Sequence, residues 1–205
     1  MTAGARIGVV GGTFDPIHLG HLAVAKAALA CGGLDRVYLV PSARPPHRRP
    51  AQASADDRLA MARLAAAGLD HVQVSDAELG RPGPSYTVDT LSELRAQHPG
   101  AELFLVLGWD AAREIAKWHQ PERVLELARV LVLNRTGLAP PSEADLRAAG
   151  LDPERVLVCA QEMPDIKATR VRKVIADGGS LDGLLAPGVA DYISKRGLYR
   201  GRDRE

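Results

Sequence analysis

Two histidines close to a glycine pair form the segment of this sequence most able to do chemistry. His18 and His21 lie within the string Gly11-Gly12-Thr13-Phe14-Asp15-Pro16-Ile17-His18-Leu19-Gly20-His21. Residues three apart on a helix share one face, so both imidazoles would project together. Glycines ahead of a helix let the backbone approach a phosphate closely, and the helix N-terminus attracts negative charge. The segment therefore indicates a site for a phosphoryl group.

The same histidines have plainer interpretations. A histidine on a helix often faces solvent or is satisfied in the core. A His-x-x-His pair can also be half of a metal site, but no carboxylate follows here in the His-Glu-x-x-His pattern. Taken alone, the pair leaves these alternatives open.

The elements that would position this segment alternate between short apolar strands and helices. We expect strands at residues 6–10, 37–40, 72–74, 103–107, 130–133 and 156–158. We expect helices at residues 18–30, 56–67, 88–97, 111–117, 122–128, 142–149, 169–176 and 189–195, with Gly32-Gly33 closing the first and Ser142 capping the sixth. This alternation predicts an α/β fold with a Rossmann-like, doubly wound parallel sheet. We expect one domain over residues 1–205, with a small C-terminal helical part.

In such a sheet, ligands bind beyond the carboxyl ends of the strands, where the strand order reverses. Segments 11–12, 41–42, 108–110 and 134–135 each follow a predicted strand directly. We therefore expect them to gather at one crevice.

Composition narrows the classes of partner. The chain has 205 residues, a hydrophobic fraction of 46% and a formal net charge of +1, so no overall field favours nucleic acid or membrane. Apolar runs stay well short of the roughly 20 residues that span a bilayer, and the N-terminus lacks the apolar core of a signal peptide. Cys31 and Cys159 lack metal-type spacing, so we expect two reduced, buried thiols and a cytoplasmic location. The oligomeric state has no sequence signal, and a homo-oligomer stays open.

The whole string from Gly11 to His21 resembles the signature of the HxGH nucleotidyltransferase superfamily, and more narrowly that of bacterial nicotinate-nucleotide adenylyltransferases. The resemblance extends along nearly the whole chain. It includes Pro-Ser-Ala-Arg-Pro-Pro-His-Arg at 41–48, Pro-Ser-Tyr-Thr-Val-Asp-Thr-Leu at 84–91, Gly108-x-Asp110 with Trp118, and Asn134-Arg135.

This resemblance implies a function and a set of partners. The reaction would transfer AMP from ATP to nicotinate mononucleotide, giving deamido-NAD and pyrophosphate. Mg²⁺ would be the cofactor, bridging the triphosphate and keeping several waters, so no protein metal ligand is named. The acceptor phosphate has a second pKa of about 6 and is largely dianionic at pH 7, so no general base is required.

The resemblance also implies roles for individual residues. His18, His21 and Arg172 would be catalytic. The ATP-binding residues would be Gly11, Gly12, Thr13, Phe14, Gly108, Asp110, Thr169, Arg48 and Lys167. The residues binding the mononucleotide would be Ser42, Tyr86, Thr87, Trp118 and Arg135. Arg48 has an equally good interpretation as a solvated loop arginine.

One segment departs from the family pattern. The family carries Ile-Ser-Ser-Thr-x-Ile-Arg near its C-terminus, where this chain has Ile-Lys-Ala-Thr-Arg-Val-Arg at 166–172. Thr169 and Arg172 match, and we expect Thr169 to cap the helix that follows. Lys167 and Ala168 replace the two serines, and Lys167 could either contact the triphosphate or point to solvent.

Two rival functions remain open at this stage. A sister adenylyltransferase acting on phosphopantetheine would share the opening motif, but would not be expected to carry the segment at 84–91. A nucleotide-binding protein with impaired catalysis is supported only by Lys167 and Ala168.

Overall fold

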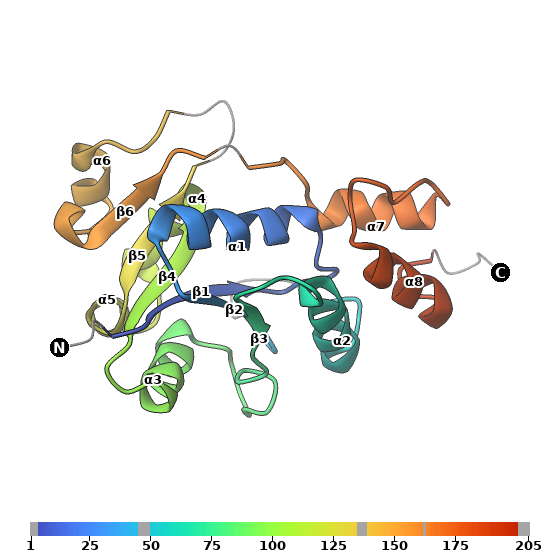
Figure 1. Ribbon diagram of the computed structural model, residues 1–205, viewed down its shortest axis with the longest axis horizontal. Coiled ribbons are helices and arrows are strands. Elements are labelled where there is room, and N and C mark those ends of the chain that lie inside the picture. The colour runs from blue at the N-terminus through green and yellow to red at the C-terminus, as the bar shows by residue number, and fades with distance from the viewer. Residues whose placement is uncertain (1–3, 45–49, 135–138, 162, 201–205) are drawn as a thin grey trace.

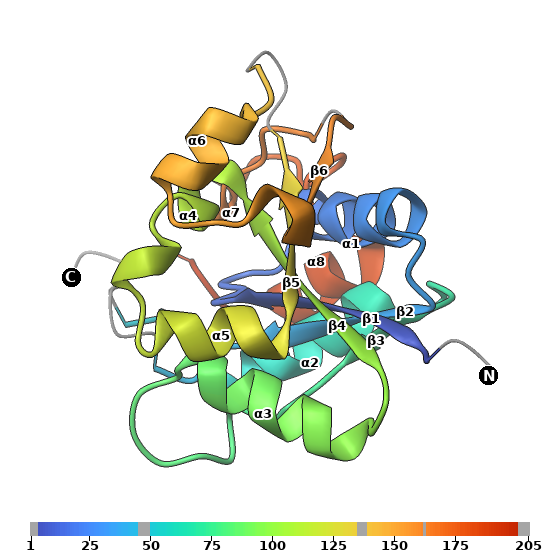
Figure 2. The same ribbon diagram turned by 90° about the vertical axis from the view of Figure 1, so that its left-hand side faces the viewer.

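The computed structural model describes residues 4–44, 50–134, 139–161 and 163–200. Its strands form one parallel sheet in the order β3-β2-β1-β4-β5-β6 (Figures 1 and 2). The strands are β1 (Arg6–Gly12), β2 (Arg36–Pro41), β3 (Val72–Val74), β4 (Glu102–Gly108), β5 (Arg129–Leu133) and β6 (Val156–Cys159). This is the doubly wound order, which reverses between β1 and β4. The predicted fold class is confirmed.

Helices cover both faces of the sheet. One core cluster includes residues of α1 (Leu19–Gly32), α2 (Ala55–Ala66), α7 (Ala168–Ala176) and α8 (Pro187–Arg196). The other includes residues of α3 (Thr87–Gln97), α4 (Trp109–Ala112), α5 (Pro121–Leu127) and α6 (Glu143–Ala148), and of the 3₁₀ turn η1 (Ile115–Lys117). A second 3₁₀ turn, η2 (Pro153–Arg155), precedes β6. Figure 1 shows α1 and α3 on opposite sides of the sheet, and no helix in the described ranges is long and apolar enough to cross a bilayer.

Residues of the central strands alternate between the two clusters. In β4, Leu103 and Leu105 belong to the cluster with α3, whereas Phe104 and Val106 belong to the cluster with α1. In β1, a Cβ at Gly8 would lie 2.7 Å from the Leu34 side chain, so this strand has room only for glycine there. A sheet buried on both faces needs nearly continuous apolar strands, which is why the strands could be predicted.

The helices lie within one or two residues of their predicted bounds, except in one region. Gly33, with φ of 56°, closes α1, and the Ser142 side chain caps α6, both as expected. Residues 111–117, predicted as a single helix, instead form α4 and η1 with a break at residues 113–114. Neither glycine nor proline marks the break. It buries Ile115 fully and lets the chain leave in an extended conformation at Trp118.

The C-terminal helix α8 docks on α2 through a buried carboxylate. Asp57 accepts hydrogen bonds from Ser54 Oγ at 2.6 Å and Tyr192 Oη at 2.9 Å, and lies 3.3 Å from Arg196 Nε. The Ser54 bond, with those from Tyr192 and Arg196, holds the pKa of Asp57 below its usual value. The predicted C-terminal helical part therefore packs onto the main core.

The expectation of two reduced thiols is wrong. Cys31, near the end of α1, and Cys159, the last residue of β6, form a disulfide with their Cα atoms 6.1 Å apart. Helix α1 packs across β5 and β6, which brings together residues separated by 128 positions in sequence. Sequence spacing carries no signal of that proximity, and the argument from reduced thiols to a reducing compartment loses its support.

Reduction should destabilise the purified protein. Closing a loop of this length stabilises a fold by about 5 kcal/mol in the chain-entropy model, because the cross-link restricts the unfolded chain. We expect urea unfolding of the oxidised protein to shift to lower urea when a reductant is added. A Cys31→Ser variant should unfold at the same urea concentration with or without reductant. Two titratable thiols in the denatured, non-reduced protein would contradict the bond.

Candidate active site

The ends of four strands meet at the carboxyl edge of the sheet, as predicted. Gly12 pairs in register with Pro41, and Gly108 with Leu133. Gly11 and Gly108 lie on either side of the reversal in strand order, and a Cβ built on either glycine would meet no described atom within 4 Å. The backbone of both strands therefore faces open space where a ligand could lie against it.

The loop after β1 is shaped by one buried aromatic ring. Phe14 is 2% exposed and has φ of 50°, a left-handed conformation that is uncommon outside glycine. Its ring meets that of His21 edge-on, with centroids 4.9 Å apart. A Cβ on Gly12 would come within 2.7 Å of the Phe14 ring. Gly12 is thus required for the position of Phe14, and Phe14 supports His21.

His18 and His21 form a stacked pair at the start of α1. Their ring centroids are 3.7 Å apart, and the ring planes are inclined by 23°. His18 is the N-cap residue, and its backbone N–H donates to His21 Nδ1 at 3.2 Å. Since His21 Nδ1 accepts, the hydrogen of the neutral His21 ring is on Nε2. The pair is held together, as the three-residue spacing predicted.

His18 is buried without charge compensation. It is 6% exposed, and burial lowers its pKa from 6.5 to about 4, so the ring is neutral at pH 7. Its Nδ1 has no hydrogen-bond partner among the described atoms, and the same holds for the buried Thr13 Oγ1 and Ser42 Oγ. Buried polar atoms are nearly always bonded, so these three atoms are candidate contacts for a ligand or an ordered water.

Gly20 makes room for the His18 ring. A Cβ at this position would lie 3.0 Å from His18 Nδ1 and 3.4 Å from Ile166 Cβ. A larger residue at position 20 would therefore require the imidazole to shift from its place. The glycine between the two histidines therefore has a steric role.

Asp15 joins the signature loop to three other segments. Its carboxylate accepts the backbone N–H of Gln52 at 2.8 Å and of Ala53 at 3.0 Å, and the Tyr199 hydroxyl at 2.7 Å. Arg172 Nη1 donates to the Asp15 carbonyl at 2.6 Å and lies 3.7 Å from its carboxylate. Burial and the bond to Asp15 raise the pKa of Tyr199. These contacts fix the loop before α2, helix α7 and the C-terminal segment against the signature.

Arg58 is a buried cation that the sequence analysis missed. Its Nη1 donates to Thr13 O at 2.7 Å and to Ser42 O at 2.6 Å, which ties the ends of β1 and β2 together. Burial lowers its pKa, and the nearby Asp15 counteracts this. A signal existed: helical spacing places Arg58 on the same face as Met61, Ala62 and Ala65, all of them buried.

The start of α7 differs from its prediction. Lys167, and not Thr169, is the N-cap residue, and it makes no side-chain cap bond. Thr169 lies inside the first turn because the helix begins one residue earlier than expected. Lys167 Nζ lies 3.7 Å from Asp165, with its side chain 61% exposed.

A groove of about 700 Å³ runs beside this helix. It is lined by Gln52, Thr169, Arg172, Lys173, Ala176, Tyr199 and Arg200. Arginine and lysine side chains with no acidic residue among these lining residues suit a polyanion. Arg172, one of the residues that line the groove, is bonded to the signature loop.

Tyr86, Thr87 and Trp118, three of the five predicted mononucleotide-binding residues, lie near one another. Tyr86 is the N-cap residue of α3, with Thr87 the first helical residue. The Tyr86 ring stacks on that of His119 with centroids 4.1 Å apart, which brings the start of α3 to the residue after Trp118. Trp118 is half-buried, so part of its ring remains accessible. His119 was not predicted.

The remaining predicted residues are placed in part. Asp110 follows Gly108 at the strand end and lies 3.9 Å from Arg113. Ser42 donates its backbone N–H to Gly12 O at 2.8 Å, next to the signature. Arg48 and Arg135 lie outside the described residues. The described ranges contain no group of three or more His, Cys, Asp or Glu side chains arranged to hold a metal ion.

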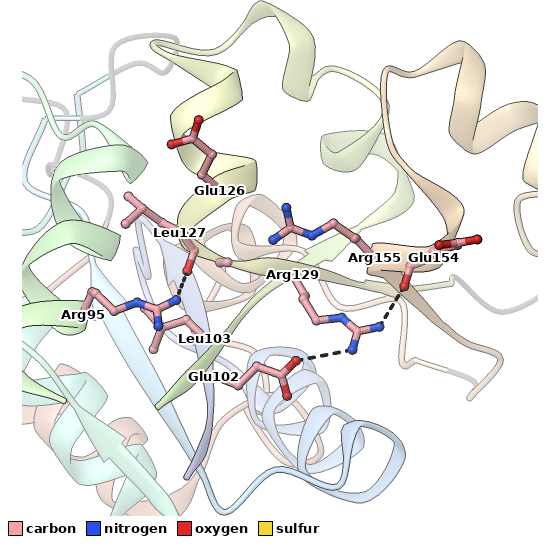
Figure 3. A pocket seen from close by; sticks show the side chains of 9 residues that line it. Arg95, Glu102, Leu103, Glu126, Leu127, Arg129, Glu154 and Arg155 are labelled. Carbon is pink, nitrogen blue, oxygen red and sulfur yellow. Dashed lines mark hydrogen bonds and ion pairs between the residues drawn. The ribbon is translucent and has the colours of Figure 1, made fainter. Parts of the chain in front are cut away.

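A smaller cleft of about 360 Å³ lies at the opposite edge of the sheet, near the starts of β4 and β5 (Figure 3). Two of its three arginines make bonds within the protein: Arg95 donates to two backbone carbonyls, and Arg129 contacts Glu102 and the Glu154 carbonyl. The guanidinium groups of Arg95 and Arg129 are therefore already engaged within the protein.

Comparisons with known proteins identify relatives of the chain. Residues 9–174 match the cytidylyltransferase-like family. The chain is 42% identical over 210 residues to a "probable nicotinate-nucleotide adenylyltransferase" of Pseudomonas fluorescens, covering 96% of this chain and 98% of that protein. It is 39% identical over 206 residues to a protein of the same description from Saccharopolyspora erythraea, covering 99% and 93%. The fold matches that of Plasmodium falciparum nicotinic acid mononucleotide adenylyltransferase complexed with NaAD, with a TM-score of 0.75 at 19% identity over 95% of this chain and 97% of that one.

The burial of neutral His18 predicts a pH-dependent loss of stability. Its pKa is about 4 in the fold and 6.5 for an ordinary histidine, so the protein takes up a proton when it unfolds between pH 4 and 6.5. The contribution of His18 to the free energy of unfolding is fully present above pH 6.5 and decreases as the pH falls toward 4. Between pH 7 and 4.5, the wild type should lose roughly 2–3 kcal/mol more unfolding free energy than His18→Gln. Urea unfolding measures the difference, and equal losses in both proteins would contradict it.

Proposed function

The chain belongs to the cytidylyltransferase-like family and, within it, to the nicotinate-nucleotide adenylyltransferases, and from this premise we propose that it transfers AMP from ATP to nicotinate mononucleotide. The products are deamido-NAD and pyrophosphate. The main support for placing this reaction here is the stacked His18–His21 pair at the start of α1. It follows β1, where Gly11, like Gly108 of β4, has open space where a side chain would be.

The chemistry needs positioning more than proton transfer. A phosphate oxygen of the mononucleotide attacks the α-phosphorus of ATP, and the bond from that phosphorus to the bridging oxygen of pyrophosphate breaks. The attacking phosphate is already largely dianionic at pH 7, so no base has to activate it. Catalysis then depends on alignment of the two nucleotides and on stabilisation of charge at the α-phosphate and pyrophosphate.

His18 and His21 supply donors for that charge. The hydrogen on His21 Nε2 and a hydrogen on His18 would contact phosphate oxygens, giving the buried His18 ring the partner it lacks. Bound phosphate also favours the protonated imidazole and so raises the pKa of His18 from its low value. The N-terminus of α1 adds its backbone N–H groups to the same region.

The other ATP contacts follow from the same geometry. The backbone of Gly11 and Gly12 with Thr13 and Phe14 would face the triphosphate, and Arg172 with Thr169 would hold its far end along the α7 groove. Gly108 and Asp110, at the end of β4, would receive the ribose. Lys167 is directed to Asp165, and we assign it no phosphate contact.

Nicotinate mononucleotide would occupy the region of α3 and η1. Thr87 and the neighbouring N–H groups at the α3 N-terminus suit the nicotinate carboxylate, and the accessible face of Trp118 suits the pyridine ring. Ser42, whose buried hydroxyl is unbonded, would contact the mononucleotide phosphate.

Mg²⁺ fits this site as a partner of the nucleotide. The side chains near the α-phosphate position are hydrogen-bond donors and not acidic groups, so the ion would be held by phosphate oxygens and water. When bound, it neutralises charge on the departing pyrophosphate. We propose a cytoplasmic location because both substrates are intracellular nucleotides.

A turnover assay tests the proposal. Purified protein with ATP, Mg²⁺ and nicotinate mononucleotide should release pyrophosphate and form deamido-NAD, detected by chromatography. Parallel reactions contain phosphopantetheine or no acceptor. Release only with phosphopantetheine would assign the chain to the sister reaction, and nucleotide binding without release would indicate an impaired enzyme.

Two substitutions separate the chemical role of the histidine from the steric role of Gly20. His18→Ala should lower kcat about 100-fold or more with the fold intact, the size seen when a charge-stabilising donor is removed. Gly20→Ala should be as stable as the wild type or more so, because alanine favours the helix by up to about 1 kcal/mol. It should nevertheless lose activity, because its Cβ displaces the His18 ring. Unchanged kcat in either variant, with thermal melts showing a folded protein, would refute the assigned role.

A further inference from the structure

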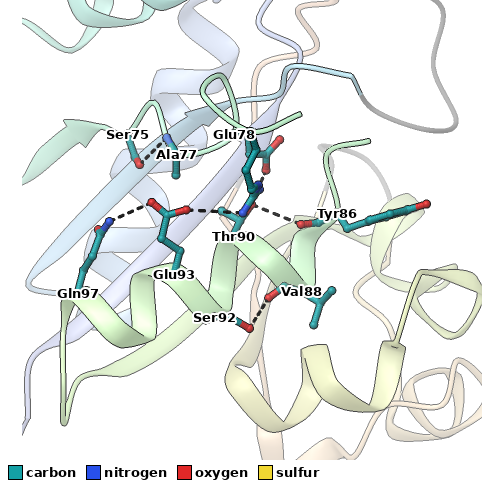
Figure 4. Close-up of polar contacts among 10 residues, drawn as sticks. Ser75, Ala77, Glu78, Tyr86, Val88, Thr90, Ser92, Glu93 and Gln97 are labelled. Atoms are coloured by element: carbon teal, nitrogen blue, oxygen red, sulfur yellow. Dashed lines mark hydrogen bonds and ion pairs between the residues drawn. The ribbon is translucent and has the colours of Figure 1, made fainter. Parts of the chain in front are cut away.

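A buried carboxylate lies beneath the segment proposed to bind nicotinate mononucleotide. Glu78, in the loop between β3 and α3, is only 7% exposed (Figure 4). Its Oε1 accepts a hydrogen bond from Thr90 Oγ1 at 2.8 Å. Burial raises the pKa of Glu78, and the hydroxyls of Thr90 and Ser85 partly oppose the rise. No step of the proposed reaction uses this group.

Thr90 connects Glu78 to the start of α3. Its hydroxyl lies 3.4 Å from the carbonyl oxygen of Tyr86, the N-cap residue of the helix. Arg81 Nη2 donates to the same hydroxyl at 2.9 Å, and Arg81 Nη1 lies 3.6 Å from Glu93. The carboxylate, the hydroxyl and the guanidinium thus form one network below Tyr86.

Ser85 connects the same carboxylate to the end of β2. Its Oγ accepts the backbone N–H groups of Ala43 and Arg44 at 3.0 and 3.1 Å. Its own hydroxyl hydrogen is therefore left for another acceptor. Glu78 Oε2 is buried and has no bond within hydrogen-bonding distance, yet the Ser85 hydroxyl is close enough to lower the pKa of Glu78. The pKa of Glu78 thus responds to the Ser85 hydroxyl as well as to that of Thr90.

Core stability does not account for this arrangement. Burying a carboxylate costs free energy that neutral hydrogen bonds repay only in part, and apolar residues of similar volume often stabilise a core better. What the carboxylate adds is direction, because its Oε1 accepts the hydrogen bond of the Thr90 hydroxyl while the Ser85 hydroxyl acts on it from the other side. Those hydroxyls flank Tyr86, whose ring stacks on His119 beside Trp118.

We propose that Glu78 is a positioning residue that, through Thr90 and Ser85, fixes Tyr86 and Thr87 for binding of nicotinate mononucleotide. The inference rests on the proposed function, because it assigns a role at the acceptor end of that site. Glu78 does not touch the substrate. ATP, bound near the signature loop and α7, should not sense the network.

Steady-state kinetics with both substrates test the proposal. Glu78→Gln keeps the side-chain size but loses the charge and one acceptor oxygen, and Thr90→Val keeps the shape but removes the hydroxyl. Each should raise the KM for nicotinate mononucleotide about tenfold, the size of one buried hydrogen bond, with the KM for ATP within about twofold of wild type. The double variant should be no worse than the poorer single variant, because both act through one network.

Ser92→Ala is the matched control for Thr90→Val. Ser92 is on the same helix, and its hydroxyl likewise bonds a carbonyl four residues earlier, that of Val88, at 2.8 Å. This variant should leave both KM values unchanged. Glu126→Gln, at an exposed residue paired with Arg123, controls for the loss of one negative charge.

The outcomes are distinguishable from failure of the proposed function. If the wild type does not turn over nicotinate mononucleotide, the function is wrong. If the wild type is active, the inference is overturned when both KM values rise together or neither changes. Should Glu78→Gln fail to fold, as judged by its thermal melt, Thr90→Val decides the question alone by the same split in KM.

Discussion

The carboxylate of Asp15 is the contact on which the arrangement of the active-site loops depends. It is buried, so it must be compensated by donors, and those donors come from three distant parts of the chain. The backbone at 52–53, the Tyr199 hydroxyl and Arg172 all reach it or its carbonyl. If any of these segments moved away, Asp15 would lose one of the donors that compensate its burial. The C-terminal helical part is therefore a support for the signature loop and not an appendage to the sheet.

The signature contains two kinds of residue: polar residues that could contact a ligand, and glycines that leave room for neighbouring rings. His18 and Thr13 carry buried polar atoms that have no partner among the described atoms, and His21 stacks on His18. Gly12 and Gly20 lack side chains, which leaves space for the Phe14 ring beside Gly12 and for the His18 ring beside Gly20. The pattern His-x-Gly-His is thus a packing requirement as much as a chemical one.

The sequence predicted well whatever is local or periodic. Strands buried on both faces are continuous apolar runs, so the sheet and the point where its strand order reverses could be predicted. The signature is contiguous in sequence, so the histidine pair could be predicted as well. Features that depend on contacts between distant parts of the chain could not. No periodic pattern in the sequence predicts three of these contacts. They are the disulfide between Cys31 and Cys159, the hydrogen bond from Tyr199 to Asp15, and the stacking of His119 on Tyr86. Arg58 is an intermediate case. Its place on the buried face of α2 could be predicted from helical spacing, but the two backbone carbonyls that accept its hydrogen bonds could not.

The replacement of two family serines by Lys167 and Ala168 gains a physical interpretation from these contacts. Lys167 is the N-cap residue of α7 but makes no cap bond, and its ammonium group is near Asp165 in solvent. The contact that holds α7 to the signature comes from Arg172, which donates to the Asp15 carbonyl one turn into the helix. The substitutions therefore alter how the helix is capped and leave its attachment to the site intact. Because the first backbone N–H groups of α7 do not depend on side-chain identity, the helix start keeps its capacity to bind an anion. The departure from the family pattern is then weak support for impaired catalysis.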